Sequence, residues 1–165
     1  MTNPIEFFKQ QVDIWNGNQH CGNCWEFGAP LSESGFEEQQ LREESKCCYQ
    51  FVITDYRTTT RSEFNTSNYL TRKICEHRFT FYVVKASDID INTFNEMDGH
   101  PVDESKWETI IQPLYDCLSC DAVLDYCQIL GYPVQIPEWS VTTVINKTSN
   151  NYDGIKVSGV FREIM

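Results

Sequence analysis

Eight cysteines in a chain of 165 residues are the side chains most able to do chemistry in this sequence. They form two C-x-x-C pairs, one adjacent pair and two single residues: Cys21/Cys24, Cys117/Cys120, Cys47/Cys48, Cys75 and Cys127. Three states are consistent with such a set: a disulfide framework, a metal site, or reduced thiols packed as small apolar residues. Each state implies a different compartment or cofactor, so the choice bears directly on function.

The N-terminal residues argue against a disulfide framework. Residues 1–15 contain no basic stretch followed by an apolar core and a small-residue cleavage site, the pattern of a secretory signal. A protein that stays in the cytosol keeps its thiols reduced. No stretch approaches the roughly 18 consecutive apolar residues that span a bilayer. We therefore expect mainly reduced and mostly buried cysteines, and no association with a membrane.

A zinc site is the alternative that stays open. His20, Cys21 and Cys24, together with Cys47 and Cys48, contain enough soft ligands for one ion. The spacing fits poorly, because the second C-x-x-C pair begins 93 residues after the first pair ends. Adjacent residues on a strand also point to opposite faces, so Cys47 and Cys48 would hardly bind the same ion. The alternative function is accordingly a cytosolic, metal-stabilised binding module that uses Cys21 and Cys24.

The remaining reactive residue types form no catalytic pattern. His20, His77 and His100 are scattered, and the sequence contains no nucleophile elbow, P-loop or dinucleotide fingerprint. His77 lies within an alternating strand pattern, where we expect it to face solvent. The sequence therefore predicts no catalytic residue, no cofactor-binding residue and no metal ligand. We expect a protein that is not an enzyme and that needs no cofactor.

Charge and composition narrow the choice of partners. The chain has 24 acidic and 13 basic residues, which gives a net charge of −11. Tight DNA binding depends on Lys and Arg that neutralise phosphates, so this balance argues against it. With 41% hydrophobic residues, the chain is able to bury one sizeable core. We expect a single domain over residues 1–165.

The first third of the chain is predicted to contain one helix and one irregular segment. Asn3 is a favourable N-cap, Pro4 suits the first helical position, and Gly17 is placed to end the helix. Ile5, Phe8, Val12 and Trp15 recur at helical spacing, which predicts an apolar face. Residues 16–46 have no sustained period but include large apolar side chains. We expect this segment to be an irregular arm or long loop that contacts a neighbouring subunit.

The rest of the chain alternates with period two and then returns to helical spacing. Residues 49–56 and 73–84 predict strands, the second one central and covered on both faces. Residues 57–61 read as a polar turn, and residues 62–70 as a weak strand or loop. Helical signals follow at 105–118 and 121–130, where Pro113 marks a kink or a fresh start. A final hairpin is predicted from 139–146 and 154–164. This order indicates an α+β domain with a largely antiparallel sheet, an N-terminal helix, a central helical segment and a C-terminal β-hairpin.

The C-terminal stretch NYDGIKVSGVF, residues 151–161, carries a resemblance together with this element order. Over about residues 47–165 the chain resembles the neck and tail-completion proteins of tailed bacteriophages, and the tail-terminator group in particular. The resemblance implies a virion structural protein, assembled in the host cytoplasm, that self-associates into a ring, commonly sixfold. It implies neighbouring phage neck or tail proteins as partners. An acidic ring through which DNA slides without sticking is consistent with the charge of the chain.

Overall fold

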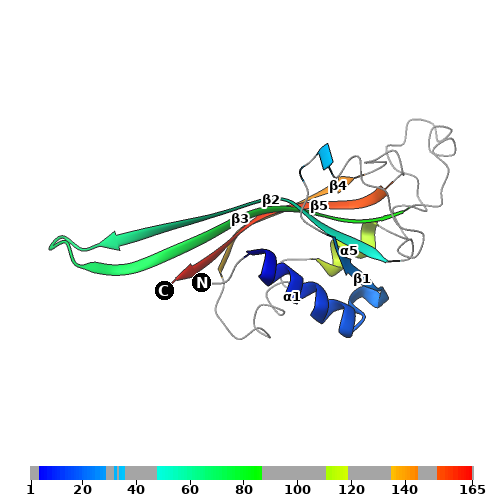
Figure 1. The fold of residues 1–165 in the computed structure, drawn as a ribbon, viewed down its shortest axis with the longest axis horizontal. Helices are drawn as coiled ribbons and strands as arrows, with labels where there is room; N and C mark the ends of the chain where they lie inside the picture. Colours follow the sequence, from blue (N-terminus) through cyan, green and yellow to red (C-terminus); the bar gives the residue numbers. More distant parts are fainter. Residues whose placement is uncertain are drawn as a thin grey trace.

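The computed structural model describes residues 4–28, 32, 34–35, 48–86, 111–118, 135–144 and 152–164. They form a mixed α+β fold in which one five-stranded, mostly antiparallel sheet has helices on one face (Figure 1). The predicted fold class is confirmed at this level. Residues 105–110 of the first predicted central helix and the whole helix predicted at 121–130 lie outside the described residues, as do His100, Cys47, Cys120 and Cys127.

The first helix, α1 (Pro4–Gly17), has the bounds that the sequence predicts. Proline fits its first turn because the N–H that proline lacks would have no partner within the helix. Phe8, Val12 and Trp15 of the predicted apolar face are buried. Phe7, which the prediction left off that face, is also buried, and its ring packs edge-on against Phe161 with 5.0 Å between centroids. The buried stripe is therefore wider than the spacing alone indicates.

The residues after α1 join the fold, which corrects the expectation of an irregular arm for this part of the chain. A short 3₁₀ turn, η1 (His20–Gly22), leads into β1 (Trp25–Phe27), which pairs in parallel with the next strand. Trp25 is 2% exposed and packs against Trp15. A strand of three residues is too short to show a period, so its burial is decided by tertiary contacts. Residues 36–46 lie outside the described part.

The next two strands are longer than predicted. β2 (Tyr49–Phe64) and β3 (Leu70–Ala86) pair antiparallel along their whole length. The polar turn predicted at residues 57–61 is therefore wrong, because these residues continue β2. Three of the five are threonines, whose β-branched side chains suit a strand. The chain reverses at residues 65–69 instead.

The C-terminal elements complete the sheet. α5 (Gln112–Cys117) has Pro113 in its first turn, and the earlier part of the helix predicted at 105–118 lies outside the described residues. β4 (Gln135–Val144) and β5 (Tyr152–Ile164) are antiparallel neighbours, as predicted for the final hairpin. The connection between them lies outside the described residues.

The strand order is β1-β2-β3-β5-β4, with β3 in the middle as predicted. The main core lies between α1, α5 and one face of the sheet. Phe8 is at its centre, with ring centroids within 5.6 Å of those of Phe51, Phe79, Phe81 and Phe161. A second, smaller cluster on the opposite face contains Val52, Tyr82, Val84 and Tyr152. Both faces of β3 are thus covered near its C-terminal end.

None of the helices that the structure describes is long and apolar enough to cross a membrane.

Candidate functional site

The length of the β2–β3 hairpin is the feature most relevant to function. β5 accompanies β3 only as far as Ile74, which pairs with Ile164. Beyond that point, β2 and β3 pair only with each other among the described residues, from Ser62↔Lys73 to Phe64↔Leu70. We call residues 61–73 the projecting hairpin. Figure 1 shows it extending well away from the helices and the rest of the sheet.

The turn at the tip of the projecting hairpin has a defined geometry. The Asn65 side-chain oxygen accepts hydrogen bonds from the backbone N–H groups of Ser67 (2.9 Å) and Tyr69 (3.0 Å). The backbone N–H of Asn65 also donates to the carbonyl of Tyr69. Asn68 has φ 64°, a left-handed conformation that asparagine tolerates better than most residues. These contacts hold the two strands in register at their far end.

Three large apolar side chains lie exposed at this tip. Phe64 is 61% exposed, Tyr69 72% and Leu70 50%. Apolar surface in water is unfavourable by about 25 cal/mol per Å², so three such residues together are unusual on an isolated protein surface. A two-stranded ribbon is also marginally stable on its own in water. The tip therefore has the composition of a surface that another molecule covers.

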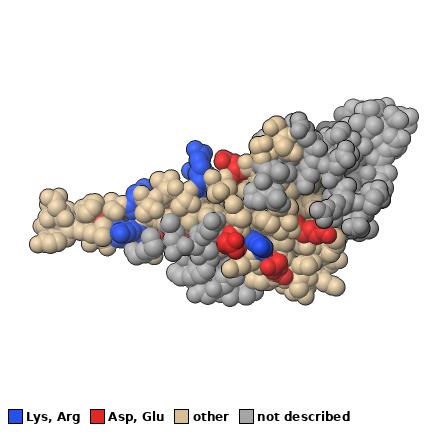
Figure 2. Space-filling view, in the orientation of Figure 1, with Lys and Arg blue, Asp and Glu red and all other residues tan. Residues whose placement is uncertain are grey.

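The charge of the β2–β3 hairpin is opposite to that of the remaining chain. Residues 49–86 contain six basic and three acidic residues, a balance of +3. The other 127 residues contain seven basic and 21 acidic residues, a balance of −14. In Figure 2 most of the blue atoms on the visible face lie over or beside this hairpin, whereas red atoms lie mainly on the body. On the projecting hairpin, the Arg72 guanidinium bonded to Glu63 holds the pKa of that carboxyl below its usual value.

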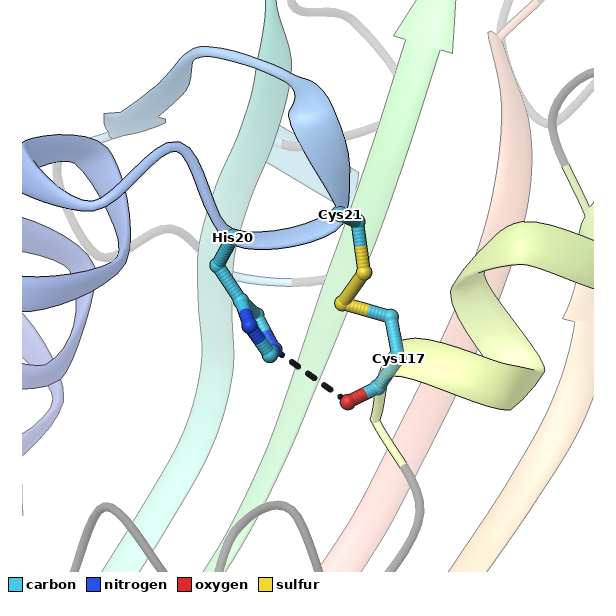
Figure 3. A group of neighbouring side chains, drawn as sticks. All are labelled: His20, Cys21 and Cys117. Atoms are coloured by element: carbon cyan, nitrogen blue, oxygen red, sulfur yellow. Dashed lines mark hydrogen bonds between the residues drawn. A yellow bond between two sulfur atoms is a disulfide. The ribbon is translucent and has the colours of Figure 1, made fainter.

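Two disulfides link elements of the body, and one of them lies beside the start of β2. Cys24–Cys48 joins the residues just before β1 and β2, with 4.8 Å between Cα atoms. Cys21–Cys117 joins η1 to the end of α5 across 96 residues of sequence, with 5.9 Å between Cα atoms. Figure 3 shows Cys21 and Cys117 bridging these two elements, with His20 beside them. The first strand and the helix below the sheet are thereby linked covalently to the rest of the body.

His20 supports the same junction. Its Nε2–H donates to the carbonyl of Cys117 at 3.2 Å, and its ring stacks on Trp15 with 5.5 Å between centroids (Figure 3). Burial lowers the pKa of His20, although the hydrogen bond to the Cys117 carbonyl partly opposes that change. The imidazole is therefore neutral at pH 7, and its role in this structure is packing and hydrogen bonding.

These disulfides correct the expectation of mainly reduced cysteines for four of the eight. The spacing of cysteines along the chain does not reveal which of them the fold brings together. Cys21 and Cys24 are bonded to different partners, so a metal module built on both would require both disulfides to be reduced. Cys75 keeps its thiol and is buried, in agreement with the expectation.

The outer face of the sheet contains a shallow groove of about 520 Å³. Its lining includes Arg78 and Glu138, which form an ion pair at 3.0 Å, and Thr80 and Ser158, whose hydroxyls lie 3.2 Å apart. Of the charged side chains that line the groove, Arg78 and Glu138 neutralise each other, and no cysteine or histidine lines it.

Two groups of residues escaped the prediction from sequence. The tip residues Phe64, Tyr69 and Leu70 were assigned to a weak strand or loop. The asparagines between them, Asn65 and Asn68, could have predicted a turn at this point of the chain. His77, expected to face solvent, is 4% exposed. It shares a strand face with Phe79 and Phe81, which are fully buried. The prediction for His77 is therefore wrong, because the alternation along β3 places it on the core side.

A scan against protein-family models and a search of curated proteins found no match to this chain. Its function is therefore argued from the residues and their arrangement.

Proposed function

We propose that the protein is a structural subunit that self-associates head-to-tail, with the projecting hairpin of one copy on the body of the next. We further propose that the assembly is a closed sixfold ring at the neck or tail end of a tailed phage particle. The observation that carries the first part is the exposed apolar tip on a hairpin that leaves the body. The resemblance of residues 47–165 to tail-completion proteins supports the second part.

The tip supplies the affinity in this proposal. Phe64, Tyr69 and Leu70 are held at the end of a turn fixed by Asn65, so little conformational freedom is lost when they are buried. Burying a large apolar side chain fully contributes about 1.5–3 kcal/mol. Aromatic side chains such as Phe64 and Tyr69 are enriched at the centres of protein interfaces.

Charge favours a second copy of this chain as the partner. The β2–β3 hairpin has a balance of +3, and the remainder of the chain has −14. The basic hairpin of one copy is attracted to the acidic remainder of another, and each copy contains both. Such a contact joins two different surfaces, so repetition of it gives a ring when the rotation closes and a filament when it does not.

The net charge also bears on DNA. An assembly of subunits at −11 each repels phosphates, so DNA is able to pass through it without tight binding. This property suits a passive connector in a virion. In this proposal the neighbouring neck or tail proteins bind above and below the ring, and the chain acts by shape and not by catalysis.

Self-association is tested by native mass spectrometry and electron microscopy over a range of protein concentrations. The double variant Phe64→Ser/Leu70→Ser removes most of the apolar tip, and we expect it to weaken association about 100-fold. Tyr56→Ser is the matched control, since Tyr56 is 45% exposed on the same strand but lies on the body side of the projecting hairpin. The control should associate like the wild-type chain.

The phage location requires a separate experiment. Microscopy of intact particles should place the chain at the neck or tail end, and the isolated subunit should bind DNA weakly even at low salt. Absence of the chain from particles would refute the virion role. Tight, salt-sensitive DNA binding would refute the passive channel, and equal association by the tip variant and the Tyr56 control would refute the role of the hairpin.

A further inference from the structure

A buried cluster of a thiol, an imidazole and a carboxylate lies where the projecting hairpin leaves the body. The Cys75 sulfur is 3.7 Å from His77 Nε2, and His77 Nε2 is 3.0 Å from a carboxylate oxygen of Glu163. One ligand atom from each of the three residues lies within 4.8 Å of both others. Two of the side chains come from β3 and one from β5, so the cluster spans two strands.

The strand register explains why the three side chains meet. Cys75 and His77 are two residues apart on β3 and share one face of the sheet. Glu163 is the β5 partner of Cys75 in the ladder, so its side chain rises from the same face. Neighbouring positions on one face of a sheet are close enough for such side chains to converge. The arrangement therefore follows from the backbone and does not depend on unusual rotamers.

This cluster is buried and is therefore not an ordinary surface ion pair. Cys75 is 0% exposed, His77 is 4% exposed, and the side chain of Glu163 is 14% exposed. A carboxylate withdrawn from water requires a compensating charge or hydrogen bonds. The same nitrogen, His77 Nε2, faces both the sulfur and the carboxylate, and a nitrogen carries only one proton. A single cation between the three atoms would bond to all of them at once.

The surroundings of the cluster match those of protein metal sites. Ring nitrogen Nδ1 of His77, the one that faces away from the cluster, lies 3.1 Å from the Thr58 hydroxyl. The Thr60 hydroxyl donates to the Cys75 sulfur at 3.9 Å. Hydrogen bonds of this kind orient histidine and thiolate ligands around metals. Both threonines come from β2, opposite His77 and Cys75 in the register, so three adjacent strands contribute.

We propose that Cys75, His77 and Glu163 bind a zinc ion. Thiolate, imidazole and carboxylate are the three ligand types that proteins use for zinc, and their mutual distances suit one tetrahedral ion with a fourth position for water or an added ligand. The ion fastens the end of β5 to β3 at the point where the sheet narrows to two strands. It would therefore fix the direction of the projecting hairpin, whether or not that hairpin mediates assembly.

Metal analysis of the purified, non-reduced protein tests the proposal. After incubation with zinc and gel filtration, the wild-type chain should retain about one zinc per chain, and Cys75→Ser, His77→Gln and Glu163→Gln should each retain far less. The matched control is His20→Gln, which removes the histidine of the other cysteine–histidine cluster, leaves the Cys21–Cys117 disulfide in place and should retain zinc. Circular dichroism shows which variants are folded.

A second readout covers variants that fail to fold. With cobalt in place of zinc, the wild-type chain and the His20→Gln control should both show the absorption of a thiolate–cobalt bond. Zinc should also raise the Tm of both proteins. A folded wild-type chain that retains no zinc, or a Cys75→Ser variant that keeps the thiolate–cobalt absorption, would overturn the proposal. In that case the three side chains form only a buried hydrogen-bonded cluster.

Discussion

Removing the disulfide between Cys21 and Cys117 should cost the protein a large part of its stability. This bond is the only covalent link between η1 and α5 among the described residues, and it closes a loop across 96 positions of sequence. The test variant is Cys21→Ser/Cys117→Ser, because serine is close to cysteine in size and avoids a large cavity. The His20 hydrogen bond to the carbonyl of residue 117 is able to remain.

The magnitude follows from the entropy of the unfolded chain. A disulfide that closes a loop near 100 residues contributes about 4.7 kcal/mol in the chain-entropy model. The inner Cys24–Cys48 bond, with a separation of 24, lies within that loop and shortens it. We therefore expect a loss of about 4 kcal/mol in the free energy of unfolding. Most domains are stable by about 5–15 kcal/mol, so the variant should stay folded only marginally or under mild conditions.

Urea unfolding of the oxidised protein measures this loss. With a slope of about 2 kcal/mol per M, the midpoint of the variant should fall by about 2 M. Reductant should lower the wild-type midpoint by more than the variant midpoint, because the variant has only the inner disulfide left to lose. Equal midpoints for the two oxidised proteins, or the absence of a disulfide-linked peptide pair containing Cys21 and Cys117 under non-reducing conditions, would refute the reasoning.

Two further predictions concern β5. Gly154→Ala should lower the free energy of unfolding by about 3 kcal/mol, because a Cβ there would lie 2.0 Å from the Val83 carbonyl oxygen. Thermal unfolding measures this loss. Gly17→Ala is the control, because a Cβ added at Gly17 would have no neighbouring atom within 4 Å. Burial raises the pKa of Tyr152 to about 12, so its contribution to stability is present below pH 10 and is lost as the pH rises from about 10 to 12. Between pH 9 and 11 the free energy of unfolding should therefore fall more for the wild-type chain than for Tyr152→Phe, by at most about 1.4 kcal/mol, and parallel curves would contradict this prediction.

The sequence predicted correctly those features that are set by residues close together in the chain. α1 was predicted with its bounds because Pro4 and Gly17 act within one turn of the helix ends. The central position of β3 followed from apolar residues on both of its faces. The turn of the β2–β3 hairpin was misplaced because Thr58 to Thr60 were read as polar, whereas their branched side chains favour a strand.

Contacts between residues far apart in the sequence could not be predicted from the spacing of residues along the chain. Cys21 bonds to Cys117 because η1 and α5 lie on the same side of the sheet, and no local sequence pattern predicts this arrangement. Glu163 reaches Cys75 only through the register of β3 and β5. His77 is different, since its two-residue spacing from Cys75 and Phe79 already placed all three on one face. Counting alternation outward from the apolar end of β3 would have predicted its burial.

The stabilising features of this fold are distributed in a way that separates folding from contact with a partner. Both disulfides lie beside β1 and α5, and the aromatic core around Phe8 lies beneath the same part of the sheet. The exposed apolar residues Phe64, Tyr69 and Leu70 lie beyond the end of β5, where the described residues show no disulfide. A change at the tip therefore alters association with little effect on the stability of the body. Loss of a disulfide has the opposite effect, because its entropy acts on the unfolded chain and leaves the surface of the tip unchanged.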